Sequence, residues 1–314
     1  MEVRKTALLY GGDVELTFVE DKSVWPEVHE YQVRFKTAKG WSEVKKVDLS
    51  VSGITKVMDK PALVGWATKM CAEYVQLNHT RLAEKVVVQT LTGLAVDEVE
   101  LGSFIQDMKS HGKGKKKEAA TIGVMAHAWI EAHIKHILGL GQKPEPVVNA
   151  AVNNAIKAYL AWEEANHVVY LATERLVYSR KLGYAGTLDT EAKVNGELSI
   201  IDNKTNSGIY PEMEYQTAGY QMACEEESFY VKRPIAYDAR WILRLDKVTG
   251  EFEARRYTDH LVAKEGFLAC RTLAKLNVAR SKAKNDRKVE QRAIRATTKA
   301  TASHRAKKKV TKTK

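Results

Sequence analysis

The sequence predicts a mixed α/β fold, because strand patterns and helix patterns both recur along the chain. Residues 1–48 contain short segments rich in β-branched and aromatic residues with partial alternation, which is typical of strands. Residues 119–138 carry the apolar spacing of a helix. Residues 183–204 contain Asn-Gly between two apolar-containing segments, which is a strong signal for a β-hairpin.

Length and composition limit the class of protein. The 314 residues can bury a large core, either as one domain with additions or as two, and the apolar fraction of 44% is ordinary for a globular protein. Cys71, Cys224 and Cys270 are widely spaced and form no CxxC motif, which favours a reducing, intracellular setting. We see no signal peptide and no run near 18 apolar residues, so we expect a cytoplasmic protein without a membrane span.

Positive charge is concentrated at the C-terminal end. The net charge is +11, while residues 271–314 alone hold 16 Lys/Arg against 2 Asp/Glu, a net of +14, which leaves −3 for the other 270 residues. Such a segment suggests a polyanionic partner, most simply nucleic acid, although a solvated tail that aids solubility is a compatible alternative. From residue 278 the pattern has no sustained apolar face, so we expect disorder, or a helix formed only on DNA.

The N-terminal half is expected to change from strands to helices near residue 50. Strands are predicted at residues 14–20, 29–36 and 43–51. Pro61 suits the first turn of a helix whose apolar side includes Trp66, which we expect in the core. Residues 80–108 should be helical in part, with a break near residues 91–93. The lysine- and glycine-rich run at residues 109–117 is predicted to be a mobile loop, either touching a phosphate backbone or simply solvated.

The helix expected at residues 119–138 carries Gly123, His127 and Glu131 on one stripe, since they are spaced at i, i+4 and i+8. A helix with this stripe can lie close to another element and present ligands to it. A single helical histidine is usually structural or exposed, so His127 becomes a candidate ligand only if carboxylates face it. A further helix is expected at residues 147–166.

A strand is predicted at residues 168–178, just before the hairpin. Glu174 lies on it and is either an extra metal ligand or a partner of Arg180. In the hairpin, Asp189 lies on the first strand, while Asp202 and Lys204 end the second strand and share one of its faces. Two carboxylates and a lysine at a strand end suit a Mg²⁺-dependent hydrolase, because carboxylates hold a hard cation and the lysine can orient or deprotonate a water.

The C-terminal half is expected to continue with a helix at residues 211–229. Gln216 and Tyr220 lie one turn apart on it and are placed to meet a substrate phosphate. A second hairpin is expected at residues 235–244 and 251–257, followed by a closing helix at residues 261–276.

In order and spacing these residues resemble the PD-(D/E)XK nuclease superfamily, in its RecB-like exonuclease branch. The segment Ser52–Ala67 is similar, more loosely, to the N-terminal segment of phage-encoded members and of the related mitochondrial genome-maintenance exonuclease. The resemblance covers roughly residues 47–276. Its matched blocks are Gly123-x3-His127-x3-Glu131, Glu174, Gly186-x2-Asp189, Ile200-Ile201-Asp202-x-Lys204 and Gln216-x3-Tyr220.

The resemblance implies a restriction-endonuclease-like core, with a central mixed β-sheet flanked by helices. We accordingly expect a β-rich segment at residues 1–50, the nuclease core with a helical N-terminal part at residues 51–276, and a basic DNA-binding tail at residues 277–314. The implied activity is that of a phage-encoded, metal-dependent DNA exonuclease that leaves 5′-phosphates in replication, recombination or degradation, in the host bacterial cytoplasm. The implied partners are DNA and a single-strand annealing or binding protein.

The resemblance also implies roles for the site residues. It assigns Mg²⁺ or Mn²⁺ to His127, Asp189, Asp202 and the backbone carbonyl of Asn203. It makes Lys204 the residue that positions or activates the attacking water, with Gln216 and Tyr220 orienting the scissile phosphate or Lys204. Glu131 and Glu174 are left open as ligands of a second metal or of a bridging water.

One expected absence and two alternative functions qualify this assignment. Some members of the family hold an iron–sulfur cluster on four cysteines, which three scattered cysteines cannot supply, so we expect no cluster. A structure-specific or nicking endonuclease of the same superfamily remains open. So does a non-catalytic DNA-binding protein on a nuclease scaffold, in which Asp189, Asp202 and Lys204 would form a structural ion-pair cluster.

Overall fold

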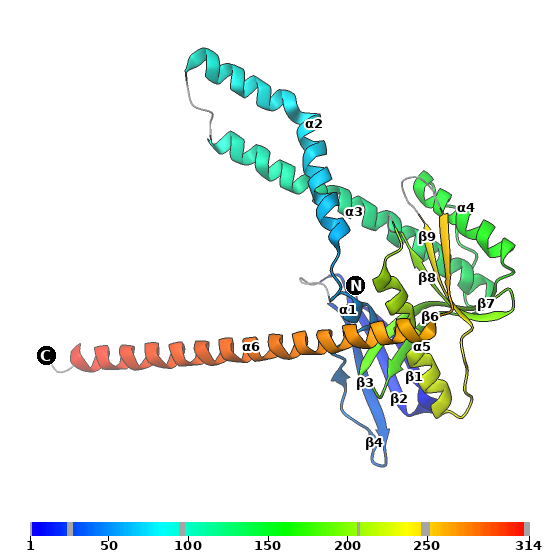
Figure 1. The fold of residues 1–314 in the computed structure, drawn as a ribbon. Helices are drawn as coiled ribbons and strands as arrows, with labels where there is room; N and C mark the ends of the chain where they lie inside the picture. The colour runs from blue at the N-terminus through cyan, green and yellow to red at the C-terminus, as the bar shows by residue number, and fades with distance from the viewer. Residues whose placement is uncertain (1, 24–27, 94–97, 206–207, 246–251, 311–314) are drawn as a thin grey trace.

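The computed structural model describes residues 2–23, 28–93, 98–205, 208–245 and 252–310. Within these ranges the mixed α/β fold is confirmed, since two five-stranded sheets are combined with long helices (Figure 1). The first sheet is antiparallel and the second is mixed. Among the described helices, none has a stretch both long and apolar enough to cross a membrane.

The N-terminal sheet has the strand order β1-β2-β3-β4, with β5 paired to β3. Its elements are β1 (Glu2–Leu9), the 3-10 turn η1 (Tyr10–Gly12), β2 (Val14–Asp21), β3 (Val28–Thr37), β4 (Gly40–Trp41) and β5 (Lys45–Lys46). The first two predicted strands, at residues 14–20 and 29–36, agree with β2 and β3, while the third, at residues 43–51, is reduced to the two residues of β5. The sheet packs its apolar face, including Leu16 and Val33, against Leu176 and Tyr178 of the second sheet.

The second sheet carries the hairpin and has the order β10-β9-β8-β7-β6. Its strands are β6 (Val169–Ser179), β7 (Tyr184–Val194), β8 (Glu197–Lys204), β9 (Ala239–Leu245) and β10 (Phe252–Tyr257). Asn195 and Gly196 both have positive φ, 52° and 87°, as a type I′ turn requires, so the predicted hairpin is confirmed. The β8–β9 pair is parallel and the other pairs are antiparallel.

Helices cover both faces of the second sheet. They are α1 (Val51–Thr55), α2 (Pro61–Thr92), α3 (Glu98–Ile137), α4 (Ala150–Ala165), α5 (Pro211–Tyr230) and α6 (His260–Val310). Side chains of α3 and α4 pack on the face that includes Ile201, and side chains of α1, α5 and α6 pack on the face that includes Ile200. Strand β8 is therefore buried on both sides, which explains why Ile200 and Ile201, on its two faces, are both fully buried.

Three expectations about the helices were wrong. Residues 109–117 are not a loop but part of α3, and at Gly112 the added Cβ of any other residue would lie 3.4 Å from Met70 of α2, so the two helices pack closely there. Trp66 lies at this contact and stays 37% exposed, so it is not a core residue. From residue 278 we expected disorder, or a helix formed only on DNA, but α6 continues to Val310 in the free chain, because no glycine or proline follows Gly266.

The two long helical segments extend away from the sheets. Figure 1 shows α2 and the first part of α3 leaving the body as a helical hairpin, and α6 leaving it as a single rod. The break expected near residues 91–93 agrees with the end of α2 at Thr92. Parts of two expected connections, residues 206–207 and 246–250, lie outside the described residues.

Candidate active site

Three separate segments bring their predicted residues to one place. His127 comes from α3, Asp189 from β7, and Asp202 and Lys204 from the end of β8. His127 Nδ1 lies 3.9 Å from Asp189 Oδ2. The same Asp189 oxygen accepts a hydrogen bond of 3.0 Å from the backbone N–H of Asn203. Lys204 Nζ forms an ion pair with Asp202 Oδ2. The imidazole, both carboxylates and the amine are thus neighbours.

Strand register and two glycines produce this convergence. Thr190 pairs with Ile201, so the hairpin register carries Asp189 alongside Asp202. A Cβ at Gly123 would lie 2.5 Å from Thr205 Oγ1, so only glycine lets α3 lie this close to the end of β8. A Cβ at Gly186 would lie 2.8 Å from a ring carbon of Tyr220, so this glycine lets α5 approach β7. Both glycines belong to the matched blocks described above.

The electrostatics of the cluster favour a bound cation. Burial, followed by the charge of Asp202, raises the pKa of Asp189 to about 8. Burial by itself lowers the pKa of Lys204, but Asp202 and Asp189 outweigh it, so the net pKa is raised and the amine stays charged. Burial, and then Lys204, lower the pKa of His127, so its imidazole is neutral at pH 7, which is the form that binds metals.

The donor chemistry fits a divalent metal ion. Asp202 has an exposed fraction of 0%, and neither of its carboxylate oxygens accepts a hydrogen bond from the described residues. A buried carboxylate without hydrogen bonds is costly unless a cation compensates it. Lys204 is the ion-pair partner of Asp202, whereas Asp189 is met by the neutral imidazole of His127 and the Asn203 N–H. Carboxylate oxygens and an imidazole nitrogen suit Mg²⁺ or Mn²⁺.

The imidazole and the carboxylates are not yet turned toward one common point. Within the described ranges, no three His, Cys, Asp or Glu side chains converge tightly enough to hold a metal as they stand. The reason is that Asp202 turns to Lys204 and Asp189 is held by the Asn203 N–H. Asn203 also forms a backbone hydrogen bond with His127, so its main chain lies among the expected ligands. Asp202 Oδ1 accepts no hydrogen bond from the described residues, so this oxygen is the one that Asp202 can offer to an ion while Oδ2 pairs with Lys204.

Gln216 and Tyr220 lie together on α5 beside this cluster. Gln216 Nε2 donates a hydrogen bond of 3.0 Å to Tyr220 Oη, and this bond fixes the two side chains relative to each other. Burial, and then the charges of Asp202 and Asp189, raise the pKa of Tyr220 well above its usual range, so the hydroxyl stays protonated. Tyr220 is only 4% exposed, which makes it a support for the site rather than an open phosphate contact.

Glu131 and Glu174 form an acidic pair next to the cluster. Lys5 Nζ lies 3.1 Å from Glu174 Oε2 and 3.7 Å from Glu131 Oε1. Lys135 also pairs with Glu131, at 2.5 Å. The alternative partner of Glu174 was wrong, because Arg180 instead lies over the rings of Tyr10, Phe35 and Tyr230, at 5.4, 5.9 and 5.2 Å.

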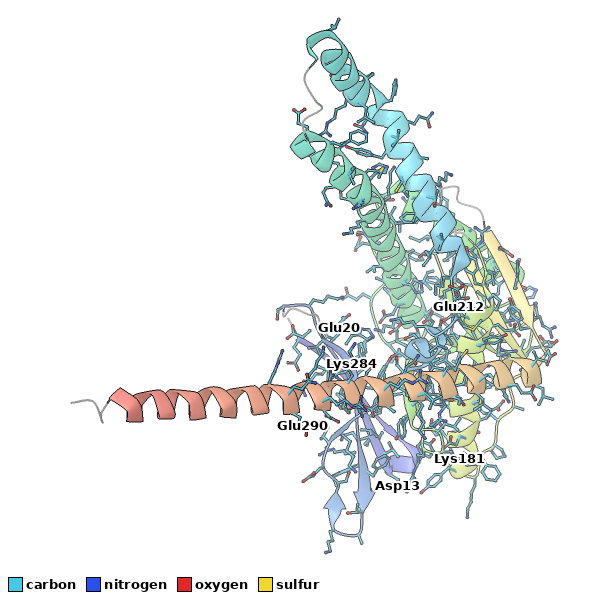
Figure 2. All side chains as sticks on the ribbon, turned by 60° about the vertical axis from the view of Figure 1, so that its left-hand side comes forward. Asp13, Glu20, Lys181, Glu212, Lys284 and Glu290 are labelled. Atoms are coloured by element: carbon cyan, nitrogen blue, oxygen red, sulfur yellow. The ribbon has the colours of Figure 1, made fainter. Side chains whose placement is uncertain are left out.

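Sequence patterns missed the contribution of the N-terminal sheet. A groove of about 440 Å³ opens beside His127 and is lined by Glu20 and Lys22 from β2 and its end, and by Gly123, Val124, His127, Ala128, Glu131 and Thr205. Figure 2 shows Glu20 on this sheet next to the lower end of α3. The sequence analysis also missed Lys5. Its one signal in the sequence is the alternation of a strand, which puts Lys5 on the same side of β1 as Ala7 and Leu9, and this side faces inward.

Neither a scan against protein-family models nor a search of the curated proteins finds a match to this chain. The resemblance to the nuclease superfamily therefore rests on the residues and their spacing.

Proposed function

We propose that this chain is a divalent-metal-dependent deoxyribonuclease that degrades DNA from an end. The observation that supports the proposal best is the meeting of His127, Asp189, Asp202 and Lys204, which lie on α3, β7 and β8 and are far apart in the sequence. A structural ion pair has no need of an imidazole beside two carboxylates and an amine, whereas a metal centre for phosphodiester hydrolysis can use each of these groups.

Each residue has a role in hydrolysis. When bound, Mg²⁺ or Mn²⁺ supplies Lewis acidity toward a phosphoryl oxygen and lowers the pKa of water. The residues that would hold the ion are His127, Asp189, Asp202 and, through its backbone carbonyl, Asn203. Lys204 orients the attacking water and stabilises the negative charge that develops on the phosphate oxygens. Gln216 and Tyr220 keep the end of β8 and Lys204 in position.

The bond changes follow from this arrangement. An oxygen of water forms a bond to phosphorus in line with the bond to the 3′-oxygen, and that bond breaks. One proton of the water passes to the departing 3′-oxygen. The products are a 5′-phosphate and a 3′-hydroxyl.

DNA is the proposed partner because the C-terminal charge suits it. Residues 271–314 have a net charge of +14, and most of them lie on α6, which extends from the body beyond the sheets (Figure 1). A helix with this charge releases counterions when it lies along a phosphate backbone. A single-strand annealing or binding protein as a second partner, and a phage recombination setting in a bacterial cytoplasm, belong to the same proposal.

One observation favours a second candidate. The buried ion pair between Lys204 and Asp202 is also what a non-catalytic DNA-binding protein on this scaffold would contain. The two functions differ in what Lys204→Ala does. In a nuclease, the substitution lowers cleavage by about 10²- to 10³-fold and leaves DNA affinity within about twofold, since it removes a donor to the developing charge. Lys193, an exposed residue of β7, is the matched control, and Lys193→Ala should cleave like the wild type.

The assay uses end-labelled linear DNA and closed circular DNA of the same sequence, with Mg²⁺ or Mn²⁺. The proposal predicts release of label from the linear DNA and none from the circle. Cleavage by Lys204→Ala at the wild-type rate would overturn the assigned site. DNA binding without any cleavage would favour the non-catalytic candidate, and rapid cutting of the intact circle would favour an endonuclease.

A further inference from the structure

The side chain of Lys5 faces the body of the protein, on the side of β1 that otherwise carries apolar residues. In β1 the inward residues are Lys5, Ala7 and Leu9, and Leu9 belongs to the core between the two sheets. The side chain of Lys5 is 37% exposed, which means that most of it is covered by the body. Its neighbour Arg4 points to the opposite side and pairs with Glu2 on the same strand. The inward direction of Lys5 is thus set by the alternation of the strand.

The acid that Lys5 meets is held in place by the backbone. Glu174 has φ of 51°, a left-handed conformation that is strained for a residue with a side chain. Its neighbours Thr173 and Arg175 pair with Thr190 and Leu188, so Glu174 lies across from Asp189 in the ladder. The charge of Glu174 also contributes to raising the pKa of Asp189, after burial and Asp202. Glu174 therefore belongs to the same electrostatic unit as the proposed metal ligands.

Glu131 completes the arrangement from the other side. It lies on α3 one turn after His127, and its Oε1 is 3.7 Å from Lys5 Nζ. A single ammonium group thus lies between a carboxylate of α3 and a carboxylate of β6. In two-metal nuclease sites a second divalent ion near the first helps to stabilise the attacking and leaving oxygens, and carboxylate oxygens are suitable ligands for such an ion. Here a lysine of the N-terminal sheet supplies the cation between the two carboxylates.

The balance of charge is consistent with one ion and not two. The charged groups of the cluster are four carboxylates and three ammonium groups, namely Asp189, Asp202, Glu131 and Glu174 with Lys5, Lys135 and Lys204. With every carboxylate ionised and His127 neutral, these groups sum to a single negative charge. One divalent ion reverses that charge, and a second ion beside Glu131 and Glu174 would face the ammonium groups of Lys5 and Lys135 at close range, which is unfavourable.

We propose that Lys5 takes the place of a second divalent cation, so that the centre works with one ion beside His127, Asp189 and Asp202 and with a fixed ammonium group beside Glu131 and Glu174. The inference rests on the proposed function, which supplies the first ion. It assigns the N-terminal sheet a part in the site, since the sheet delivers the amine. It also decides the alternative left open by the sequence, because Glu131 and Glu174 are then partners of Lys5 and not metal ligands.

The test counts bound Mn²⁺ by the electron paramagnetic resonance signal of the free ion, using the full chain at pH 8. Wild-type protein should bind one ion. Lys5→Met should bind two, because Glu174 then loses its ammonium partner, Glu131 keeps only Lys135, and the two carboxylates attract a cation. Lys5→Arg keeps the charge and should bind one. Arg4→Met removes a positive charge from the same strand on its outward side and should also bind one, which makes it the matched control.

A further variant separates the two proposals. Asp202→Asn should lose the ion of the wild-type protein. If the wild type binds no Mn²⁺, or if Asp202→Asn binds as many ions as the wild type, the metal centre of the proposed function is overturned. If Lys5→Met binds the same number of ions as the wild type, or if the wild type already binds two, the role of Lys5 is overturned while the proposed function stands. Should Lys5→Met fail to fold, Lys5→Gln keeps a polar side chain and carries the same expected count. A purely structural role for Lys5 would alter the melting temperature and leave the count at one.

Discussion

Replacement of Gly123 by alanine tests how the site is assembled. Gly123 lies one helical turn before His127, and a Cβ there would be 2.5 Å from Thr205 Oγ1 and 3.5 Å from Thr205 Cβ. Thr205 directly follows Lys204 at the end of β8. Gly123→Ala must therefore either rotate Thr205 or move α3 away from β8, and the second response moves His127 away from Asp189.

The size of the effect follows from two opposing terms. Glycine to alanine inside a helix gains about 1 kcal/mol. Overpacking of a close contact costs about 1–3 kcal/mol. The net expectation is that the free energy of unfolding falls by about 0–2 kcal/mol. Gly114 lies on the same helix with nothing within 4 Å of its Cβ position, so Gly114→Ala should be neutral or stabilising. The difference between the two variants should be about 1–3 kcal/mol.

The functional effect should exceed the effect on stability. Misplacement of a catalytic group by about 1 Å costs up to roughly a hundredfold in rate, so a smaller shift of His127 should cost about tenfold. We expect Gly123→Ala to show this loss in the release of label from linear DNA, while Gly114→Ala keeps the wild-type rate. Chemical unfolding of both variants supplies the free energies.

A double variant decides whether the contact with Thr205 is responsible. Thr205→Ala removes the oxygen that the new Cβ would meet, so Gly123→Ala with Thr205→Ala should recover most of the lost stability and activity. The reasoning is refuted if Gly123→Ala is as stable and as active as Gly114→Ala. It is refuted as well if the second substitution recovers neither property.

Three more predictions concern pH, the C-terminal helix and the second close glycine. The pKa of Asp189 is raised to about 8 in the folded protein, against about 4 in the unfolded chain. Protonated Asp189 therefore stabilises the ion-free fold, and this stabilisation is lost as the pH rises from about 4 to about 8. Bound ion displaces that proton, so Mn²⁺ affinity should rise about tenfold per pH unit between pH 6 and 8 and then level off, and Asp189→Asn should abolish the trend, as measured by calorimetry. Deletion of residues 280–314 should weaken DNA binding and reduce the slope of log affinity against log salt by several units, and an unchanged slope would argue against α6 as a DNA contact. Gly186→Ala should lower the free energy of unfolding by about 1–3 kcal/mol, because its Cβ would lie 2.8 Å from both Tyr220 and Val51, and a wild-type melting temperature would show that this contact can relax.

Local patterns predicted the elements that depend on near neighbours. The hairpin followed from Asn195-Gly196, whose positive φ values only suit a few residue types. The shared face of Asp202 and Lys204 followed from the period of a strand, and the stripe of His127 followed from the period of a helix. Such features depend on a few consecutive residues, so no knowledge of the tertiary structure was needed.

Other features depended on contacts between distant segments. The run at residues 109–117 has the composition of a loop, yet it is helical because α2 packs against it at Gly112. The polar pattern from residue 278 indicated disorder or a helix formed only on DNA, yet helix-forming residues continue α6 without a glycine or proline to end it. In both cases a composition rule gave way to packing or to intrinsic helix propensity.

The sequence by itself determined the chemical types at the candidate site and the local backbone that carries them. Only the tertiary structure decided which of these groups share a volume. Lys5 meets Glu174 across 169 residues of sequence, and no spacing rule connects two such positions. The physical reason is that sheet register, helix packing and close glycine contacts act between segments, whereas periodicity acts within one.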